Sequence, residues 1–216
     1  MNELRKQRAE RFRKTGLYLV IGHEFTGGRS IFDVLAAAAD GGVRTVQLRE
    51  KNLSGRELTL LAEKFRRKCD ELGVLMLMND HVDIALAVGA DGVHLGQDDM
   101  PLEAARRIAP ELILGRSTHS VEQALEAQAQ GADYVNLGPI FPTRTKNTPV
   151  QPLGLEIIRS AAPELSIPFS VMGGVKEHNI PLLYNAGARI FAMVTELTQA
   201  EDVTAKARAM CALLRE

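Results

Sequence analysis

The chain has 216 residues, of which 45% are hydrophobic and 25% are charged, and its formal net charge is −1. This length suits one domain over residues 1–216, because no linker or low-complexity stretch divides it. The near-neutral charge gives no general attraction to nucleic acid or to an anionic membrane. No apolar run approaches the roughly 18 residues of a membrane span, and the polar first residues lack a signal-peptide pattern, so we expect a cytoplasmic protein.

Residues 1–14 are basic and predict a solvated helical extension ahead of the first strand, rather than an arm that binds a partner. Short apolar runs that are rich in Leu and β-branched residues then predict buried parallel strands. These runs occur at residues 17–21, 44–48, 74–78, 92–95, 112–115, 133–137, 168–172 and 190–194. Helical patterns separate them, and capping-box patterns at Ser54-x-x-Glu57 and Ser120-x-x-Gln123 mark two helix starts.

One phrase, Gly-Ala-Asp-x-Val-x-Leu-Gly, occurs at residues 89–96 and 131–138, with weaker echoes that begin at Gly42 and Gly187. In each copy, a glycine that ends a helix precedes a short strand. Repetition at similar intervals indicates a fold that copies one unit of two strands and two helices. The pattern predicts a single (β/α)8 TIM barrel with a short N-terminal helical extension. An open doubly wound sheet is the alternative, and the four copies argue against it.

Barrel enzymes place functional groups just after the strands, at the C-terminal rim. Polar or glycine residues follow the predicted strands of this chain. They include Gln47, Arg49, Lys51, Asn79, Asp80, Asp99, Ser117, His119, Thr143, Arg144, Thr145, Lys146, Gly173, Gly174, Val194 and Thr195. The sequence therefore predicts a site at this rim.

The charges at the predicted rim indicate an anionic ligand. Arg49, Lys51 and Lys146 come from two strands and would converge on a strongly anionic group. Asp80 and Asp99 add carboxylates from neighbouring strands, and carboxylates among cations predict a Mg²⁺ site completed by diphosphate oxygens. Both aspartates also precede a predicted helix, so the alternative is that each is an N-cap. The converging cations favour the metal.

Gly173-Gly174 and Val194-Thr195 predict a second anion site, because barrels often bind phosphate at the loops after strands seven and eight. A glycine pair alone also fits a tight turn. The loop over residues 143–152 is a candidate lid that carries Lys146.

The histidines form no zinc pattern, and the sequence has no Walker-A loop or dinucleotide fingerprint. His94 is expected to be a hydrogen-bonded group in the barrel, and His119 is expected near the rim. A hydrolase built on Ser117 and His119 is disfavoured, because no residue pattern orients that pair. Cys69 and Cys211 fall on apolar helical faces and predict free thiols in a reducing compartment.

Several segments resemble, in the same order, those of the thiamine phosphate synthase family. They lie at residues 47–51, 79–80, 91–101, 117–120, 138–146 and 173–175, and the resemblance runs from about residue 17 to 205. It implies a transferase that joins hydroxymethylpyrimidine diphosphate to a thiazole phosphate (or its carboxylate). The products would be thiamine phosphate and pyrophosphate, formed with Mg²⁺ by loss of diphosphate before attack of the thiazole nitrogen.

The resemblance also implies roles for single residues. The pyrimidine diphosphate site falls on Gln47, Arg49, Lys51, Asn79, Ser117 and Lys146, of which Arg49, Lys51, Lys146 and Ser117 are the expected catalytic residues. The Mg²⁺ ligands fall on Asp80 and Asp99. The thiazole phosphate site falls on Thr143, Arg144, Thr145, Gly174, Val194 and Thr195. The family often has Ser where Thr195 stands, and the loop over residues 21–24 lacks the Asp expected there.

Two other functions stay open. A thiazole tautomerase of the same fold keeps the thiazole-phosphate glycines but loses much of the diphosphate site. A catalytically silent protein that binds thiamine precursors would keep the ligands without turnover. The synthase is favoured because the charged residues Arg49, Lys51, Asp80, Asp99 and Lys146 are all retained. The oligomeric state is left open, a homo-oligomer included.

Overall fold

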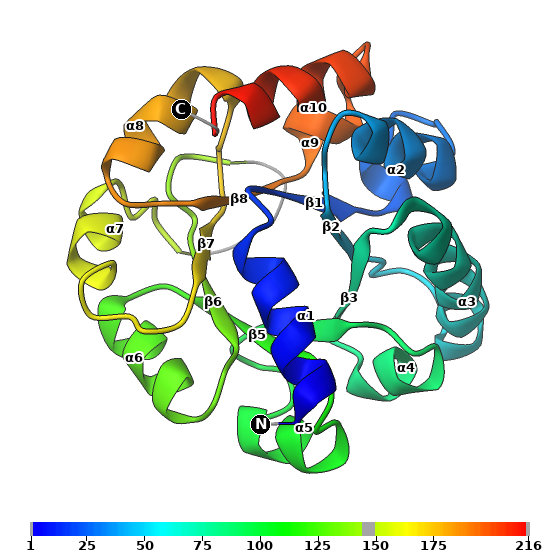
Figure 1. The fold of residues 1–216 in the computed structure, drawn as a ribbon, viewed down its shortest axis with the longest axis horizontal. Helices are drawn as coiled ribbons and strands as arrows, with labels where there is room; N and C mark the ends of the chain where they lie inside the picture. Colours follow the sequence, from blue (N-terminus) through cyan, green and yellow to red (C-terminus); the bar gives the residue numbers. More distant parts are fainter. Residues whose placement is uncertain (1, 144–149, 215–216) are drawn as a thin grey trace.

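The computed structural model describes residues 2–143 and 150–214. Eight parallel strands close into a barrel in sequence order, and β8 pairs with β1 (Figure 1). The strands are β1 (Leu17–Ile21), β2 (Thr45–Leu48), β3 (Leu75–Asn79), β4 (Gly92–Leu95), β5 (Ile113–Thr118), β6 (Tyr134–Leu137), β7 (Phe169–Val171) and β8 (Ile190–Met193). The predicted (β/α)8 TIM barrel is confirmed, and the open doubly wound sheet is wrong.

Helices surround the barrel (Figure 1). They are α2 (Ile31–Asp40), α3 (Gly55–Leu72), α4 (Val82–Ala87), α5 (Leu102–Ile108), α6 (Val121–Ala129), α7 (Glu156–Ala161), α8 (Ile180–Asn185), α9 (Thr195–Thr198) and α10 (Val203–Ala212), with 3-10 turns η1 (His23–Phe25) and η2 (Glu177–Asn179). Ser54 and Glu57 form a complete capping box at α3. Only half of the second predicted box forms, because the Gln123 side chain bonds the His119 N–H instead.

Side chains alternate along each strand between two apolar regions. On β1, Leu19 faces the surrounding helices, whereas Tyr18 and Val20 face the barrel interior. The interior is also lined by Leu75, Leu77, Ile113, Tyr134, Ile190 and Ala192. The same alternation on β2, β4 and β5 turns Gln47, His94 and Ser117 inward, so polar groups enter the barrel above an apolar floor.

Helix α1 (Glu3–Arg13) crosses the N-terminal end of the barrel (Figure 1). Its Phe12 is buried against two interior rings, with centroid separations of 5.7 Å to Tyr18 and 4.0 Å to Tyr134. Such ring pairs add stability beyond the area that they bury. The helix therefore closes the end of the barrel opposite the predicted site.

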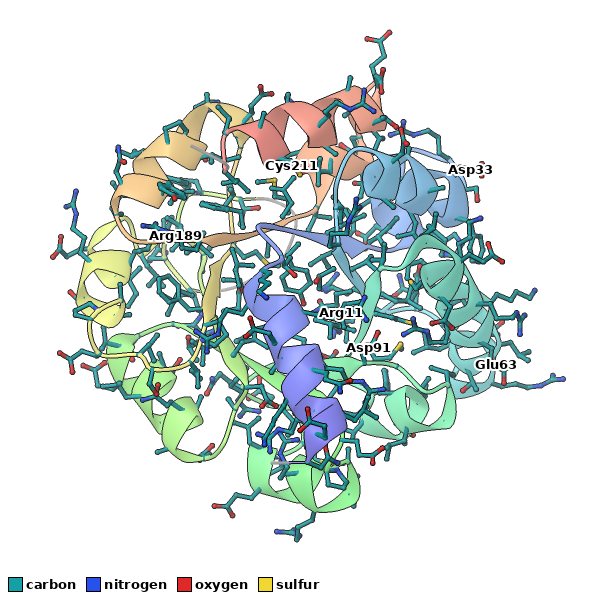
Figure 2. All side chains as sticks on the ribbon, in the orientation of Figure 1. Arg11, Asp33, Glu63, Asp91, Arg189 and Cys211 are labelled. Carbon is teal, nitrogen blue, oxygen red and sulfur yellow. The ribbon has the colours of Figure 1, made fainter. Side chains whose placement is uncertain are left out.

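In the two full copies of the repeated phrase, the aspartate connects α1 to the barrel through ion pairs. The Asp91 carboxylate accepts the Met76 N–H at 2.8 Å and pairs with Arg66 at 2.7 Å and Arg8 at 3.3 Å. Figure 2 shows Asp91 close to α1 on this face. The matching partners of Asp133 are the Leu114 N–H, Arg106 and Arg5, at 2.8, 2.6 and 2.8 Å. The expectation of a solvated extension is thus wrong for Arg5 and Arg8, whose charges are neutralised at the barrel.

Both cysteines are free thiols, as predicted, with Cys69 buried and Cys211 half-buried. Burial raises the pKa of the Cys69 thiol to about 12. No helix in the described part of the chain is both long and apolar enough to cross a membrane.

Candidate active site

A cavity of about 520 Å³ opens at the C-terminal end of the barrel, among the ends of β5 to β8 and the loops that follow them. Five of the predicted site residues line it: Ser117, Thr143, Gly174, Val194 and Thr195. His119 also lines it, as expected for the rim. The structure therefore brings the predicted second anion site and Ser117 into one hollow. Arg144, Thr145 and Lys146, and with them most of the candidate lid, lie outside the described residues.

The glycine pair after β7 lies directly against the loop after β6. Gly173 and Gly174 have φ angles of +95° and +64°, which favour glycine. A Cβ on Gly174 would lie 2.6 Å from the Phe141 Cβ and 2.8 Å from the Pro142 oxygen. Glycine at 174 is thus required by the fold, and a larger residue there would displace the β6 loop.

Two ionic side chains on the cavity wall were not predicted from the sequence. Lys176 and Glu196 are the charged residues among the described ones that line the cavity, and their Nζ and Oε2 atoms lie 3.2 Å apart. Glu196 also contacts Lys206, at 3.1 Å. Burial raises the pKa of Glu196, but hydrogen bonds from Lys206 and Lys176 outweigh it and lower the net pKa, so this carboxylate is charged. The signal for Lys176 was its place just after the glycine pair.

Asp80 and Asp99 lie together beside Lys51, as predicted. Their carboxyl groups are in hydrogen-bonding contact, and Asp80 also forms an ion pair with the Lys51 ammonium. Burial raises the pKa of Asp99, and the neighbouring Asp80 raises it further. Burial opposes ionisation of Asp80 as well, but hydrogen bonds from Asp99 and Lys51 lower its net pKa. The two carboxyl groups thus share one ion pair, with Lys51.

The alternative that these aspartates cap helices is wrong. Helix α4 begins after His81 and α5 begins after Pro101, and neither helix has a side-chain cap from an aspartate. Asp80 instead has a φ angle of +64°, the positive-φ exception among the described non-glycine residues. Asp99 accepts the Gly96 N–H at 2.6 Å, within its own loop. Their placement therefore needs an explanation other than capping.

The donor set at this pair suits a hard divalent cation. Mg²⁺ is commonly held by one or two carboxylates together with substrate phosphate oxygens. Among the described residues, no cluster of three or more His, Cys, Asp or Glu side chains is arranged to hold a metal. Asp80 and Asp99 would supply two ligands, and other oxygens must come from elsewhere.

The remaining described residues of the predicted site lie on β2 and β3 or directly after β2, and they do not line the cavity. Asn79 is buried at the end of β3, next to Asp80. Gln47 is buried inside the barrel, and its Nε2 donates to the Tyr18 hydroxyl at 2.6 Å. Arg49 is anchored by its backbone, which donates to the Ile21 carbonyl at 2.8 Å.

Hydrogen bonds connect Ser117 to the carboxylate pair. His94 Nε2 lies 2.9 Å from Ser117 Oγ, and the His94 carbonyl accepts the Asp80 N–H at 2.9 Å. His94 is thus a hydrogen-bonded interior group, as expected. The disfavoured Ser117–His119 pair is not formed, because His119 Nδ1 contacts the Gly138 carbonyl at 2.5 Å. His94 thus contacts both Ser117 on the cavity wall and the backbone of Asp80.

Strand β5 is longer than predicted and carries Ser117 itself, because pairing with β6 continues to Thr118 opposite Leu137. The residue paired with Ser117 is Asn136, which lines the cavity and was missed. Asn136 stands two residues after Tyr134 on β6 and therefore faces the same side of the strand, and this spacing could have identified it.

Known proteins are similar to this chain in sequence and in fold. A family model described as thiamine monophosphate synthase matches residues 17–197. The chain belongs to this family. It is 42% identical over 201 residues to the thiamine-phosphate synthase of Shouchella clausii, covering 93% of this chain and 96% of that protein. It is 43% identical over 199 residues to that of Pelotomaculum thermopropionicum, covering 92% and 91%.

Solved structures are also similar to this chain. The thiamine phosphate pyrophosphorylase of Pyrococcus furiosus superposes with a TM-score of 0.87 at 33% identity, covering 95% of this chain and 98% of that one. A 3-hexulose-6-phosphate synthase reaches a TM-score of 0.71 at 20% identity, over 92% and 99% of the two chains. That second likeness is one of fold alone.

Proposed function

We propose that this chain is a transferase that joins hydroxymethylpyrimidine diphosphate to a thiazole phosphate, giving thiamine phosphate and pyrophosphate. The observation that carries the proposal is the pairing of Asp80 and Asp99 beside Lys51 at the same end of the barrel as the cavity. The cavity is lined by Thr143, Gly174, Val194 and Thr195, which the resemblance assigns to the thiazole phosphate. Membership of the synthase family supports the same reaction.

The two substrates would occupy the two connected parts of the site. Gln47, Arg49, Lys51, Asn79 and Ser117, with Lys146, would hold the pyrimidine diphosphate. Thr143, Gly174, Val194 and Thr195, with Arg144 and Thr145, would hold the thiazole phosphate. Lys176 adds a cation to the second group, which suits a phosphate.

Asp80 and Asp99 would hold Mg²⁺, which when bound neutralises negative charge on diphosphate oxygens. The chain's own cations act on the same charge. As the bond from the methylene carbon to the diphosphate oxygen breaks, negative charge grows on the leaving group. Arg49 and Lys51 would stabilise that charge, and Lys146 would join them.

The bond that forms joins the methylene carbon to the thiazole nitrogen, so the protein needs no nucleophile of its own. Diphosphate would leave first, because the aminopyrimidine can stabilise the methylene cation. Holding the thiazole within reach of that carbon is then the main task of the cavity. No proton must be removed for this bond to form, which fits histidines that are engaged with the protein itself.

The test is to incubate the pure protein with both precursors and Mg²⁺ and to measure thiamine phosphate and pyrophosphate. We expect both products in equal amounts, and none when either precursor is omitted. A tautomerase would instead isomerise the thiazole phosphate without the pyrimidine. A silent binding protein would bind the precursors and form neither product. Cytoplasmic location is part of the proposal, and two free thiols support it.

A further inference from the structure

A continuous row of side chains inside the barrel connects Gln47 to Ser117. Gln47 Nε2 lies 2.6 Å from the Tyr18 hydroxyl, which lies 3.2 Å from the Tyr134 hydroxyl. The Tyr134 hydroxyl lies 2.9 Å from His94 Nδ1, and His94 Nε2 lies 2.9 Å from Ser117 Oγ. The two ends of this row are residues of the proposed pyrimidine site, whereas its middle lies below that site.

The middle of the row is sealed from solvent. Tyr18 and Tyr134 are 1% and 0% exposed, and His94 is 7% exposed. Burial raises the pKa of both phenols, so both are neutral hydroxyls that donate one hydrogen bond each. The Tyr134 ring is fixed by Phe12 on one side and by Gly115, where a Cβ would lie 2.0 Å from the ring.

The chemistry of the first donor favours one direction for the later hydrogen bonds, in which each phenol both accepts and donates. The Gln47 amide nitrogen can only donate, so the Tyr18 oxygen accepts. Each phenol then accepts one bond and donates one if Tyr18 donates to Tyr134 and Tyr134 donates to His94 Nδ1. In this arrangement His94 carries its proton on Nε2 and donates it to Ser117 Oγ. The Ser117 hydroxyl, having accepted from below, has its own proton left to donate into the cavity.

We propose that this row is a positioning relay that makes Ser117 a hydrogen-bond donor toward an acceptor nitrogen of the pyrimidine substrate and fixes Gln47 relative to it. The inference rests on the proposed function, since it needs the pyrimidine at Ser117. It also separates Ser117 from a hydrolase nucleophile. A nucleophilic serine donates its proton to histidine, whereas here the histidine donates to the serine.

A double-mutant cycle tests whether Tyr134 acts through Ser117. Tyr134→Phe removes one hydroxyl and keeps the ring between Phe12 and Gly115. We expect it to lower kcat/KM for the pyrimidine diphosphate about tenfold, the loss typical of one neutral hydrogen bond of about 1.4 kcal/mol. In a Ser117→Ala background the same substitution should have almost no further effect. The KM for the thiazole phosphate should stay unchanged in the Tyr134→Phe variant.

Thr45→Val is the matched control. Thr45 lies on β2, two residues before Gln47, and its buried hydroxyl bonds that of Thr15 rather than the relay. This variant should lose a buried hydrogen bond and some thermal stability, with kcat/KM as in the wild type. Tyr18→Phe breaks the relay one step further from Ser117 and should repeat the Tyr134→Phe result if that variant fails to fold.

Three outcomes would overturn the relay. Losses from Tyr134→Phe and Ser117→Ala that multiply in the double variant would mean that the hydroxyl only stabilises the barrel. Wild-type kinetics of the Tyr134→Phe variant would also mean that the Tyr134 hydroxyl does not act on Ser117. Wild-type kinetics of Ser117→Ala, with thiamine phosphate still formed, would refute the relay and leave the proposed reaction standing. The reaction itself fails only if the unmodified protein forms no thiamine phosphate.

Discussion

Substitutions of Lys176 and Glu196 should change the affinity for the thiazole phosphate in opposite directions. The two side chains pair at 3.2 Å on the cavity wall, and Lys206 contacts Glu196 from the other side. Because Lys206 continues to neutralise Glu196, Lys176 can turn toward a bound phosphate at little cost. Lys176→Met removes that cation, whereas Glu196→Gln removes a competing anion and still offers an oxygen to the Glu177 N–H.

The expected size follows from the exposure of Lys176, whose side chain is 53% exposed. Two unit charges about 4 Å apart attract by about 1 kcal/mol in bulk water and by about 4 kcal/mol at an effective dielectric constant of about 20. For a half-exposed lysine we take about 1–2 kcal/mol. Lys176→Met should then weaken thiazole phosphate binding about 5- to 30-fold, and Glu196→Gln should strengthen it by a smaller factor.

Calorimetric titration with the thiazole phosphate and with its dephosphorylated form is the assay. The effect of Lys176→Met should be confined to the phosphorylated ligand. Lys68→Met is the control for charge alone, since Lys68 lies on α3 and pairs with Glu71 at 3.0 Å, outside the cavity lining. Weaker phosphate binding in both Lys176→Met and Glu196→Gln would refute the reasoning, because a purely structural ion pair is broken equally from either side.

Asp80→Asn should fold normally, since Asn tolerates the positive φ of this position, but its turnover should fall about 10²–10³-fold and respond to added Mg²⁺. Wild-type turnover would contradict the metal site. Phe12→Ala should lower the free energy of unfolding in urea by about 3–5 kcal/mol. A loss below about 1 kcal/mol would mean that α1 does not close the barrel. Because burial raises the pKa of Cys69 to about 12, its thiolate is scarce at pH 8, and peptide mapping should find it unalkylated until the protein unfolds. Rapid alkylation of the native protein would contradict this.

The fold and the location of the site were predictable because they depend on local patterns. Each buried strand is a short apolar run, and the strand order follows from alternation with helices, so errors were confined to strand ends. The largest error was at β5, which continues through Ser117 because its pairing with β6 does. Cross-strand pairing of this kind depends on residues far apart in the sequence.

Features set by tertiary contacts were not predictable. Nothing in the sequence distinguishes Arg5 and Arg8 from the other basic residues of α1, yet these two meet buried aspartates. Asp80 and Asp99 matched the pattern of helix caps, but their geometry does not, because Asp80 adopts a positive φ and Asp99 bonds its own loop. Lys176 follows the glycine pair closely in the sequence, but only the structure shows that it lines the cavity.

The balance of charge explains why Asp91 and Asp133 stabilise the barrel, whereas Asp80 and Asp99 belong to the candidate site. At the N-terminal end, Asp91 and Asp133 are each neutralised by two arginines and also accept a strand N–H, so neither has charge to offer a cation. At the C-terminal end, Asp80 and Asp99 share one described lysine contact, with Lys51, and Asp80 raises the cost of ionising Asp99. A divalent cation would relieve that repulsion. The same residue type thus stabilises the barrel at one end and is suited to bind Mg²⁺ at the other.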